Sequence, residues 1–221
     1  MKIYVVGSSK NSFLPLDNIR EKFFVDETHD GDNIDFLNPW YCELTGLYYL
    51  CKNVDDNIVG LEHYRRYFVN ECGNLLSEND INCLLKTNDV ICRKCMFSMY
   101  NHKTAIEILN KTGVTPYLEK FLTTLPQDET NFILNALNNN DFFEQCNMCI
   151  CKSTILEEWL NWFIEHAIIF TSHELFNKPR IIGYIAEYVF GCFLKYRHYK
   201  IVYAPSVTYD PSLSKVIEVC K

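Results

Sequence analysis

"IVGLEHYRRYF", residues 58–68, is the stretch that decides the fold of this 221-residue chain. Its first four residues form a continuous apolar run, the pattern of a central strand that is covered on both faces. The run stops at Glu62, and a histidine, a tyrosine and two arginines follow directly. In open α/β sheets, ligands bind at the carboxyl ends of the strands. The stretch therefore predicts a buried strand with a ligand site at its end.

Strand and helix patterns alternate along the rest of the chain. Short β-branched and aromatic runs predict strands, and apolar residues at helical spacing predict helices. Residues 14–36 form a polar stretch with no regular pattern. The alternation predicts an α/β fold with helices flanking a mixed, mainly parallel sheet. Strands are expected at 2–6, 58–61, 89–92, 146–151 and 200–205, and helices at 38–53, after Ser77, from Thr115, and at 129–140, 153–170 and 179–196.

Composition narrows the class of protein. The chain is 48% hydrophobic and carries a formal net charge of -7, so a globular domain is expected and a nucleic acid is not expected as partner. No apolar run approaches a membrane span or a signal core, and the eleven cysteines are expected to stay reduced in a cytoplasm. Residues 1–221 are expected to form one domain, which can be part of a longer chain because its C-terminal end has no clear stop.

The charged group after the apolar run offers two kinds of ligand contact. Glu62 and His63 are candidate ligands for Mn²⁺ or Mg²⁺, with a phosphate completing the shell. Arg65 and Arg66 can donate to phosphate oxygens. Neighbouring residues on a strand face opposite ways, however, so the two arginines reach one ligand only if the strand has already ended. The alternative, that these residues merely line an exposed strand end, stays open.

Three other features remain ambiguous from residues alone. The acidic stretch "DETHDGDNID", residues 26–35, lacks the spacing of a calcium loop and is either a solvated loop or one that folds over a ligand. The C-x-x-C pairs Cys92/Cys95 and Cys146/Cys149 are better explained by buried thiols than by zinc. Glu187 lies beside the apolar stripe of its helix, where it is a surface residue or, near a cleft, a general-base candidate. No glycine-rich phosphate loop occurs.

The blocks "DGDNIDFLNPWYCELTGLYYLCKN" and "IVGLEHYRRYF" together resemble a bacterial and viral glycosyltransferase family that builds capsular polysaccharides. The resemblance continues in "MYNHK", in "CNMCICKSTILEEWLNWF" and in "RIIGYIAEYVF", and so covers most of the chain. It implies a GT-A-like, Rossmann-like fold that binds a UDP-sugar. It also implies an inverting hexosyltransferase acting on a glycan or glycoprotein acceptor in surface or capsid polysaccharide synthesis.

The resemblance assigns roles to individual positions. Glu187 would deprotonate the acceptor hydroxyl, and His63 would meet the diphosphate and the sugar. "EHY" stands where such enzymes usually carry an Asp-x-Asp metal motif, so Glu62 and His63 would hold a divalent cation, Mn²⁺ or Mg²⁺. The remaining nucleotide-sugar contacts would come from Val6, Gly7, Asp32, Asn38, Tyr41, Glu43, Tyr64, Arg65 and Arg180.

Two other functions are compatible with the same sequence. Because the Asp-x-Asp motif is missing, the chain can also be a module that binds a nucleotide sugar but does not catalyse its transfer. A sugar-nucleotide pyrophosphorylase on a similar fold would need a glycine-rich loop after the first strand, and "GSSKNSF", residues 7–13, is a poor one.

Overall fold

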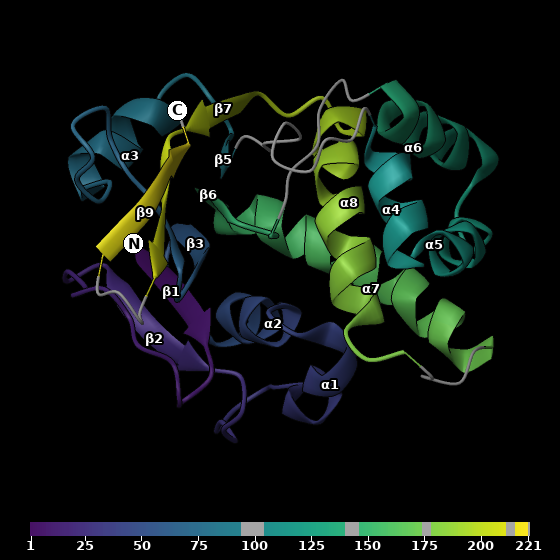
Figure 1. Cartoon of the computed structure of the whole chain (residues 1–221), viewed down its shortest axis with the longest axis horizontal. Helices are drawn as coiled ribbons and strands as arrows, with labels where there is room; N and C mark the ends of the chain where they lie inside the picture. The colour runs from purple at the N-terminus through teal and green to yellow at the C-terminus, as the bar shows by residue number, and fades with distance from the viewer. Residues whose placement is uncertain (94–103, 140–145, 174–177, 211–214, 221) are drawn as a thin grey trace.

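The computed structural model describes residues 1–93, 104–139, 146–173, 178–210 and 215–220 (Figure 1). The described strands form one sheet in the order β7-β5-β6-β3-β4-β8-β9, and β1 joins β3 to β2 at the side of this path. The strands are β1 (Lys2–Gly7), β2 (Arg20–Phe24), β3 (Ile58–His63), β4 (Arg66–Phe68), β5 (Val90–Arg93), β6 (Cys149–Lys152), β7 (Ile201–Ala204), β8 (Ser206–Asp210) and β9 (Lys215–Cys220).

The directions of the strands confirm the mixed, mainly parallel α/β sheet. Strand β1 is parallel to β2 and to β3, and β5 is parallel to β7. Strand β6 lies antiparallel between β3 and β5, so those two run in the same direction as each other. The carboxyl ends of β1, β2 and β3 therefore meet at one edge of the sheet, where the sequence predicts the ligand site.

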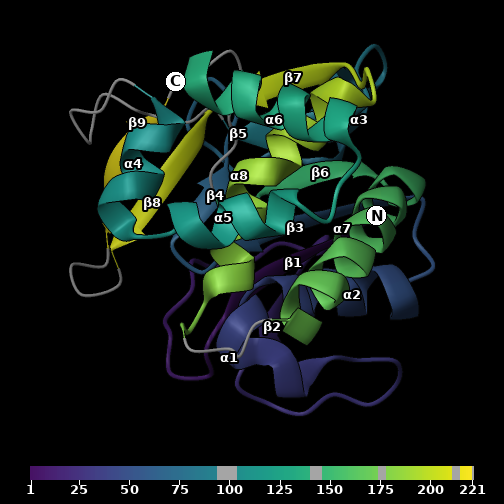
Figure 2. The same ribbon diagram turned by 90° about the vertical axis from the view of Figure 1, so that its right-hand side faces the viewer.

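Helices cover both faces of the sheet, most of them on one side. The larger hydrophobic core packs helical side chains such as Trp159 and Phe163 against Tyr4, Val59 and Leu61 of the strands. A smaller core packs α3 against the opposite face (Figures 1 and 2). The helices are η1 (Asp35–Leu37), α1 (Asn38–Tyr41), α2 (Leu44–Asn53), α3 (Glu78–Leu85), α4 (Ala105–Thr112), α5 (Thr115–Leu122), α6 (Gln127–Asn139), α7 (Ser153–His173) and α8 (Ile181–Tyr196).

Three predicted elements need correction. The helix expected over 38–53 is broken into α1 and α2, because Cys42 has φ 54° and ψ -127°, which no helix allows. The strand expected over 146–151 starts only at Cys149, since Cys146 and Asn147 have left-handed backbones. The polar stretch over 14–36 contains β2, an edge strand whose exposed Glu21 and Lys22 hide the strand pattern.

Some sequence expectations lie outside the described residues. These are the "MYNHK" block at 99–103 and Cys95, the second cysteine of one C-x-x-C pair. Among the described helices, none is both long enough and apolar enough to cross a membrane.

A buried ion pair fixes the orientation of β3. Arg20 of β2 donates to both oxygens of Glu62, from Nε at 2.8 Å and from Nη2 at 3.1 Å, and both side chains have 0% exposure. Glu62 also accepts from the backbone N–H of Phe68 at 3.0 Å, and Arg20 donates to Asp17 and to the carbonyl of Leu76. The pair therefore joins β2, β3 and the chain beyond β4 on the face that carries α3.

Replacing one partner of this pair should lower the free energy of unfolding far more than replacing both partners together. Glu62→Gln takes the bidentate carboxylate from the buried guanidinium, whose remaining ion pair is with the partly exposed Asp17, and should cost about 3–5 kcal/mol of unfolding free energy. Arg20→Met with Glu62→Met should stay within about 2 kcal/mol of wild type. Urea unfolding measures both. Glu21→Gln, which breaks the exposed pair with Lys2, is the control and should cost less than about 1 kcal/mol. Equal losses in the single and double variants would contradict this account.

Candidate active site

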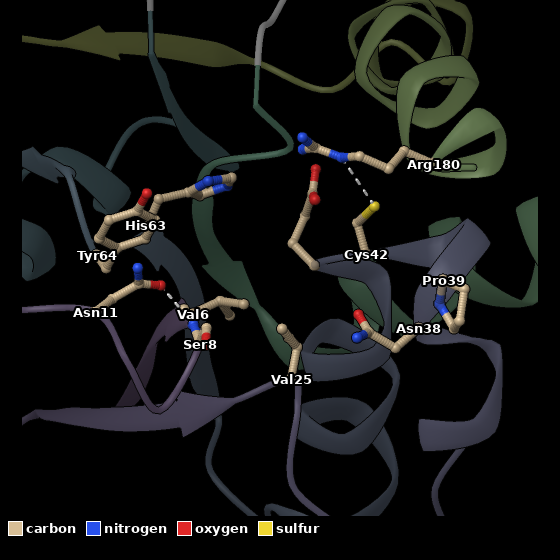
Figure 3. A pocket seen from close by; sticks show the side chains of 12 residues that line it. Val6, Ser8, Asn11, Val25, Asn38, Pro39, Cys42, His63, Tyr64 and Arg180 are labelled. Carbon is tan, nitrogen blue, oxygen red and sulfur yellow. Dashed lines mark hydrogen bonds between the residues drawn. The ribbon is translucent and has the colours of Figure 1, made fainter. Parts of the chain in front are cut away.

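A cavity of about 400 Å³ opens at the carboxyl ends of β1 and β3. His63 and Tyr64 on one wall face Arg180 and Cys42 across it (Figure 3). Its floor includes the ends of the first two strands and the start of α1, so elements distant in the sequence converge here. The lining residues are Val6, Gly7, Ser8, Asn11, Val25, Asn38, Pro39, Cys42, Glu43, His63, Tyr64 and Arg180.

The alternation of β3 separates the two predicted metal ligands. Val59 and Leu61 face the larger core, so His63, two residues on, points to the same side and reaches the cavity. Glu62 points to the other face, where Arg20 and the Phe68 N–H occupy its oxygens. The predicted metal pair of Glu62 and His63 is therefore not formed. Among the described side chains, no three His, Cys, Asp or Glu residues gather as a metal site.

His63 is held as a neutral imidazole. Its Nε2 lies 2.5 Å from the carbonyl oxygen of Cys146, so Nε2 carries the proton and donates it. Burial lowers the pKa of His63 to about 4, and the arginines Arg66 and Arg93 act in the same direction while Glu43 opposes them. At neutral pH His63 therefore donates a hydrogen bond without carrying a charge.

Two carboxyl groups lie on the helical side of the cavity. Glu43 precedes α2, lines the cavity with 6% exposure, and accepts from Asn147 Nδ2 at 3.0 Å. Glu187 of α8 is not among the lining residues, but the charges of Glu43, Arg66 and Arg180 act on it. Burial, and then the negative charge of Glu43, raise the pKa of Glu187 to about 8, against the opposing charges of Arg66 and Arg180. Glu187 therefore carries a proton in most molecules at neutral pH, and it can exchange that proton near pH 8.

Arg180 places a positive charge at the start of α8. Its backbone N–H donates to the carbonyl of Pro39 at 2.8 Å, and its side-chain Nε lies 3.4 Å from the sulfur of Cys42. Arg180 is the N-cap residue of α8, and its own side chain makes no capping hydrogen bond. The guanidinium and the positive end of the 16-residue helix thus act together, an arrangement that favours an anion.

Strained backbone surrounds this site. Four of the non-glycine residues with positive φ are Cys42, Cys146, Asn147 and Arg180, at 54°, 74°, 51° and 63°. Each either lines the cavity or contacts one of its acid–base groups. Residues held in such conformations cost stability and concentrate at functional sites.

The structure brings most of the predicted binding residues together. Val6, Gly7, Asn38, Glu43, His63, Tyr64 and Arg180 line the cavity. A side chain at Gly7 would come within 2.9 Å of the Phe13 ring and 3.0 Å of Tyr64 Cβ, so the glycine permits a close approach there.

Three predicted contacts lie elsewhere. Tyr41 is 1% exposed and belongs to the core beneath α1. Asp32 lies on the exposed loop, where it accepts from the hydroxyl of Tyr48 at 3.0 Å. Arg65 lies over the ring of Tyr64 at 5.1 Å and is not among the lining residues. None of the three is among the residues that line this cavity.

Sequence reasoning missed Cys42, Cys146 and Asn147 as parts of the site, and it considered Arg66 only as a donor to phosphate oxygens beside Arg65. Arg66 follows Arg65 directly, and its side chain was expected to face the opposite way. Its positive charge lowers the pKa values of His63 and Glu187. The other three occupy left-handed positions, which residue type signals weakly, except that asparagine tolerates this conformation well.

Comparisons with known proteins bear on the fold. The family model described as "Domain of unknown function (DUF4422)" matches residues 2–198. No curated protein matches the chain. The apo structure of the bifunctional glycosyltransferase WbbM aligns with a TM-score of 0.74 and 19% sequence identity, covering 93% of this chain and 44% of that one. The chain thus has the fold of one part of WbbM and spans less than half of its length.

The raised pKa of Glu187 predicts a specific pH dependence of stability. Its folded pKa, about 8, lies above the ordinary 4.5, so its favourable contribution is complete below pH 4.5 and is lost as the pH rises through 8. Between pH 5 and pH 9, the wild-type protein should lose about 4 kcal/mol more unfolding free energy than Glu187→Gln. Denaturant unfolding at both pH values measures this. Glu165→Gln, at an exposed position of the neighbouring α7, should follow wild type. Equal losses of unfolding free energy in wild type and Glu187→Gln would show that the pKa of Glu187 is not raised.

Proposed function

We propose that this chain, which belongs to the DUF4422 domain family, is a glycosyltransferase of the hexosyltransferase class. It transfers a sugar from a UDP-sugar to a hydroxyl group of a glycan acceptor. One observation carries the proposal: a neutral histidine, Glu43 and an arginine at a helix N-terminus line one cavity at the strand ends, and Glu187 lies close enough for the charges of Glu43 and Arg180 to act on it. The fold shared with part of WbbM is consistent with it.

The charges around the cavity suit the departure of a nucleoside diphosphate. Negative charge grows on the leaving oxygen as the bond to the sugar breaks. Arg180 and the N-terminus of α8 stabilise that charge more in the transition state than in the ground state. The Nε2–H of His63 is committed to the carbonyl of Cys146, which leaves Nδ1 as an acceptor for a hydroxyl group of the sugar.

Proton removal from the acceptor falls to the carboxyl groups. Glu187 is the proposed base, and its pKa of about 8 makes it a strong proton acceptor once ionised. Glu43 lines the cavity, and its negative charge helps to raise the pKa of Glu187. A carboxylate on the side opposite the leaving group gives inversion at the anomeric carbon. The acceptor we propose is a growing surface or capsid polysaccharide, and the compartment is the cytoplasm. The described cysteines are all free thiols, which is compatible with a reducing compartment.

A divalent cation, expected from the resemblance, does not fit the described donor set. Glu62 is engaged by Arg20, and His63 alone is left of the predicted pair. No step of the proposed mechanism therefore runs through Mn²⁺ or Mg²⁺. Arg180 and the helix terminus neutralise the diphosphate instead.

The rate of sugar transfer should follow the ionisation of Glu187. Below pH 8 the value of kcat should rise about tenfold per pH unit and then level off above pH 8, because only the ionised carboxylate accepts a proton. Glu187→Gln should lower kcat by about 10²–10⁴-fold and abolish this rise. The measurement is a screen of UDP-sugars for donor hydrolysis and transfer, followed by a pH–rate profile with the active donor.

His63→Ala is tested in the same screen, and it should also lose most of the turnover that the wild-type protein shows. Full turnover in both variants would show that neither Glu187 nor His63 takes part in catalysis. Binding of UDP with no hydrolysis of any donor would favour the non-catalytic module. Preference for a nucleoside triphosphate would favour a pyrophosphorylase.

Affinity for UDP should depend on Arg180 and not on metal. Arg180→Met removes a charged donor to phosphate and should weaken UDP binding by about tenfold to a hundredfold. Chelation of divalent cations should change the dissociation constant by less than about twofold. Isothermal calorimetry with UDP, with Mn²⁺ or with a chelator, measures both. Arg197→Met, which removes an arginine paired with Glu158 away from the cavity, is the control. Binding that requires Mn²⁺ would overturn this part of the proposal.

A further inference from the structure

Two adjacent arginines lie at the tight turn between β3 and β4, and the structure gives them different surroundings. Arg65 is exposed, and its guanidinium lies over the ring of Tyr64 at 5.1 Å. Arg66 is half-buried and is the residue of β4 that pairs with His63 across the two antiparallel strands. Residues that pair directly across antiparallel strands have Cβ atoms about 4.5–5.5 Å apart, so the side chains of Arg66 and His63 start side by side.

The course of β4 shows which way the side chain of Arg66 points. Arg66 and Phe68 are two residues apart on a strand, so they share a face. Phe68 packs in the smaller core together with Cys146, whose carbonyl binds His63. The charge of Arg66 accordingly acts on His63, on Cys146 and on Glu187. Arg66 therefore faces the groups of the active site, while Arg65 faces solvent.

The guanidinium of Arg66 has no counter-ion within the described part of the chain. No described side chain or carbonyl forms an ion pair or a hydrogen bond with it. Other arginines of the same sheet are engaged, since Arg20 binds Glu62 and Arg93 donates to Ser206 Oγ at 2.8 Å. A charged group that is partly withdrawn from water is stabilised by an anion beside it. The positive charge of Arg66 is thus available to a ligand.

Arg180 approaches the same site from the other side. His63 and Arg180 lie on opposite walls of the cavity (Figure 3), and Arg66 stands beside His63. Arg66 is not itself a lining residue, so its long side chain has to extend toward the cavity to meet a ligand. Guanidinium groups match the oxygens of a phosphate with forked donors, and two of them on opposite sides suit an anion with two charged groups.

We propose that Arg66, and not its neighbour Arg65, is the second arginine of the diphosphate site, and that Arg66 and Arg180 hold the two phosphates from opposite sides. The inference rests on the proposed function for the identity of the nucleotide. The anion site itself is a property of the free protein, because it needs neither a donor sugar nor an acceptor.

Calorimetry of the full chain with inorganic pyrophosphate and with UDP tests the inference. Arg66→Met should weaken the binding of both by about ten- to a hundredfold, because a hydrogen bond to a charged group contributes a factor of that size. Arg65→Met is the matched control. It removes the same charge from the adjacent exposed position, where water and salt screen it, and should change either affinity by less than about threefold.

Arg66→Lys separates the forked donor from the charge. It keeps the positive charge and most of the aliphatic stem, so its affinity should fall between those of wild type and Arg66→Met. Urea unfolding of the same variants checks the fold. Because Arg66 has no described partner to lose, Arg66→Met should keep the urea midpoint of wild type, whereas a clear drop in both variants would assign Arg66 a structural role and overturn the inference.

The binding results decide the rest. Wild-type affinity for pyrophosphate in Arg66→Met and Arg66→Lys would overturn the inference, as would an equal loss in Arg65→Met or a wild-type protein that binds neither pyrophosphate nor UDP. Sugar transfer is not a readout here. A chain that binds UDP through Arg66 but transfers no sugar would therefore contradict the proposed function and support this inference.

Discussion

The buried pair of Arg20 and Glu62 is the constraint on which the site depends. Glu62 is bound by a guanidinium and by a backbone N–H on the face of β3 that carries α3. Since strand residues alternate, holding Glu62 on that face holds His63 on the other, where the cavity lies. Any slip of β3 by one residue would bury the histidine and turn the carboxylate toward the ligand, and the loss of a fully satisfied buried pair opposes it.

Burial then decides the charges that the cavity presents. It lowers the pKa of His63 to about 4 and raises the pKa of Glu187 to about 8, so both groups are mainly neutral at pH 7. The charges left at the cavity wall are those of Glu43 and Arg180, which line it from different helices. In the function proposed above, Arg180 faces the departing diphosphate, and Glu187 removes the acceptor proton once it is ionised.

The strained turns show where stability is given up for this arrangement. Cys42 ends α1 and starts the approach to Glu43, Arg180 starts α8, and Cys146 with Asn147 joins the histidine to the carboxyl groups. Close packing holds them, since a side chain at Gly183 would lie 3.3 Å from the carbonyl of Tyr41. Such positions persist only because the surrounding core determines them. The large aromatic core around Trp159 supplies that support.

The sequence by itself determined the α/β class, the central strand at IVGL and the helix cap at Ser77, because these follow from local periodicity and from capping chemistry. The expectation that Tyr64 and Arg180 lie with His63 at one site came from the family resemblance, and all three line the same cavity. The sequence could not determine the role of Glu62, whose partner Arg20 lies 42 residues away on a strand hidden by exposed charged residues. Nor could it place Glu187 near Glu43, or find Asn147 between His63 and the carboxyl groups. Only the tertiary structure decided those, because desolvation and hydrogen bonding between distant segments set the charge of a side chain, and neither leaves a periodic trace in the sequence.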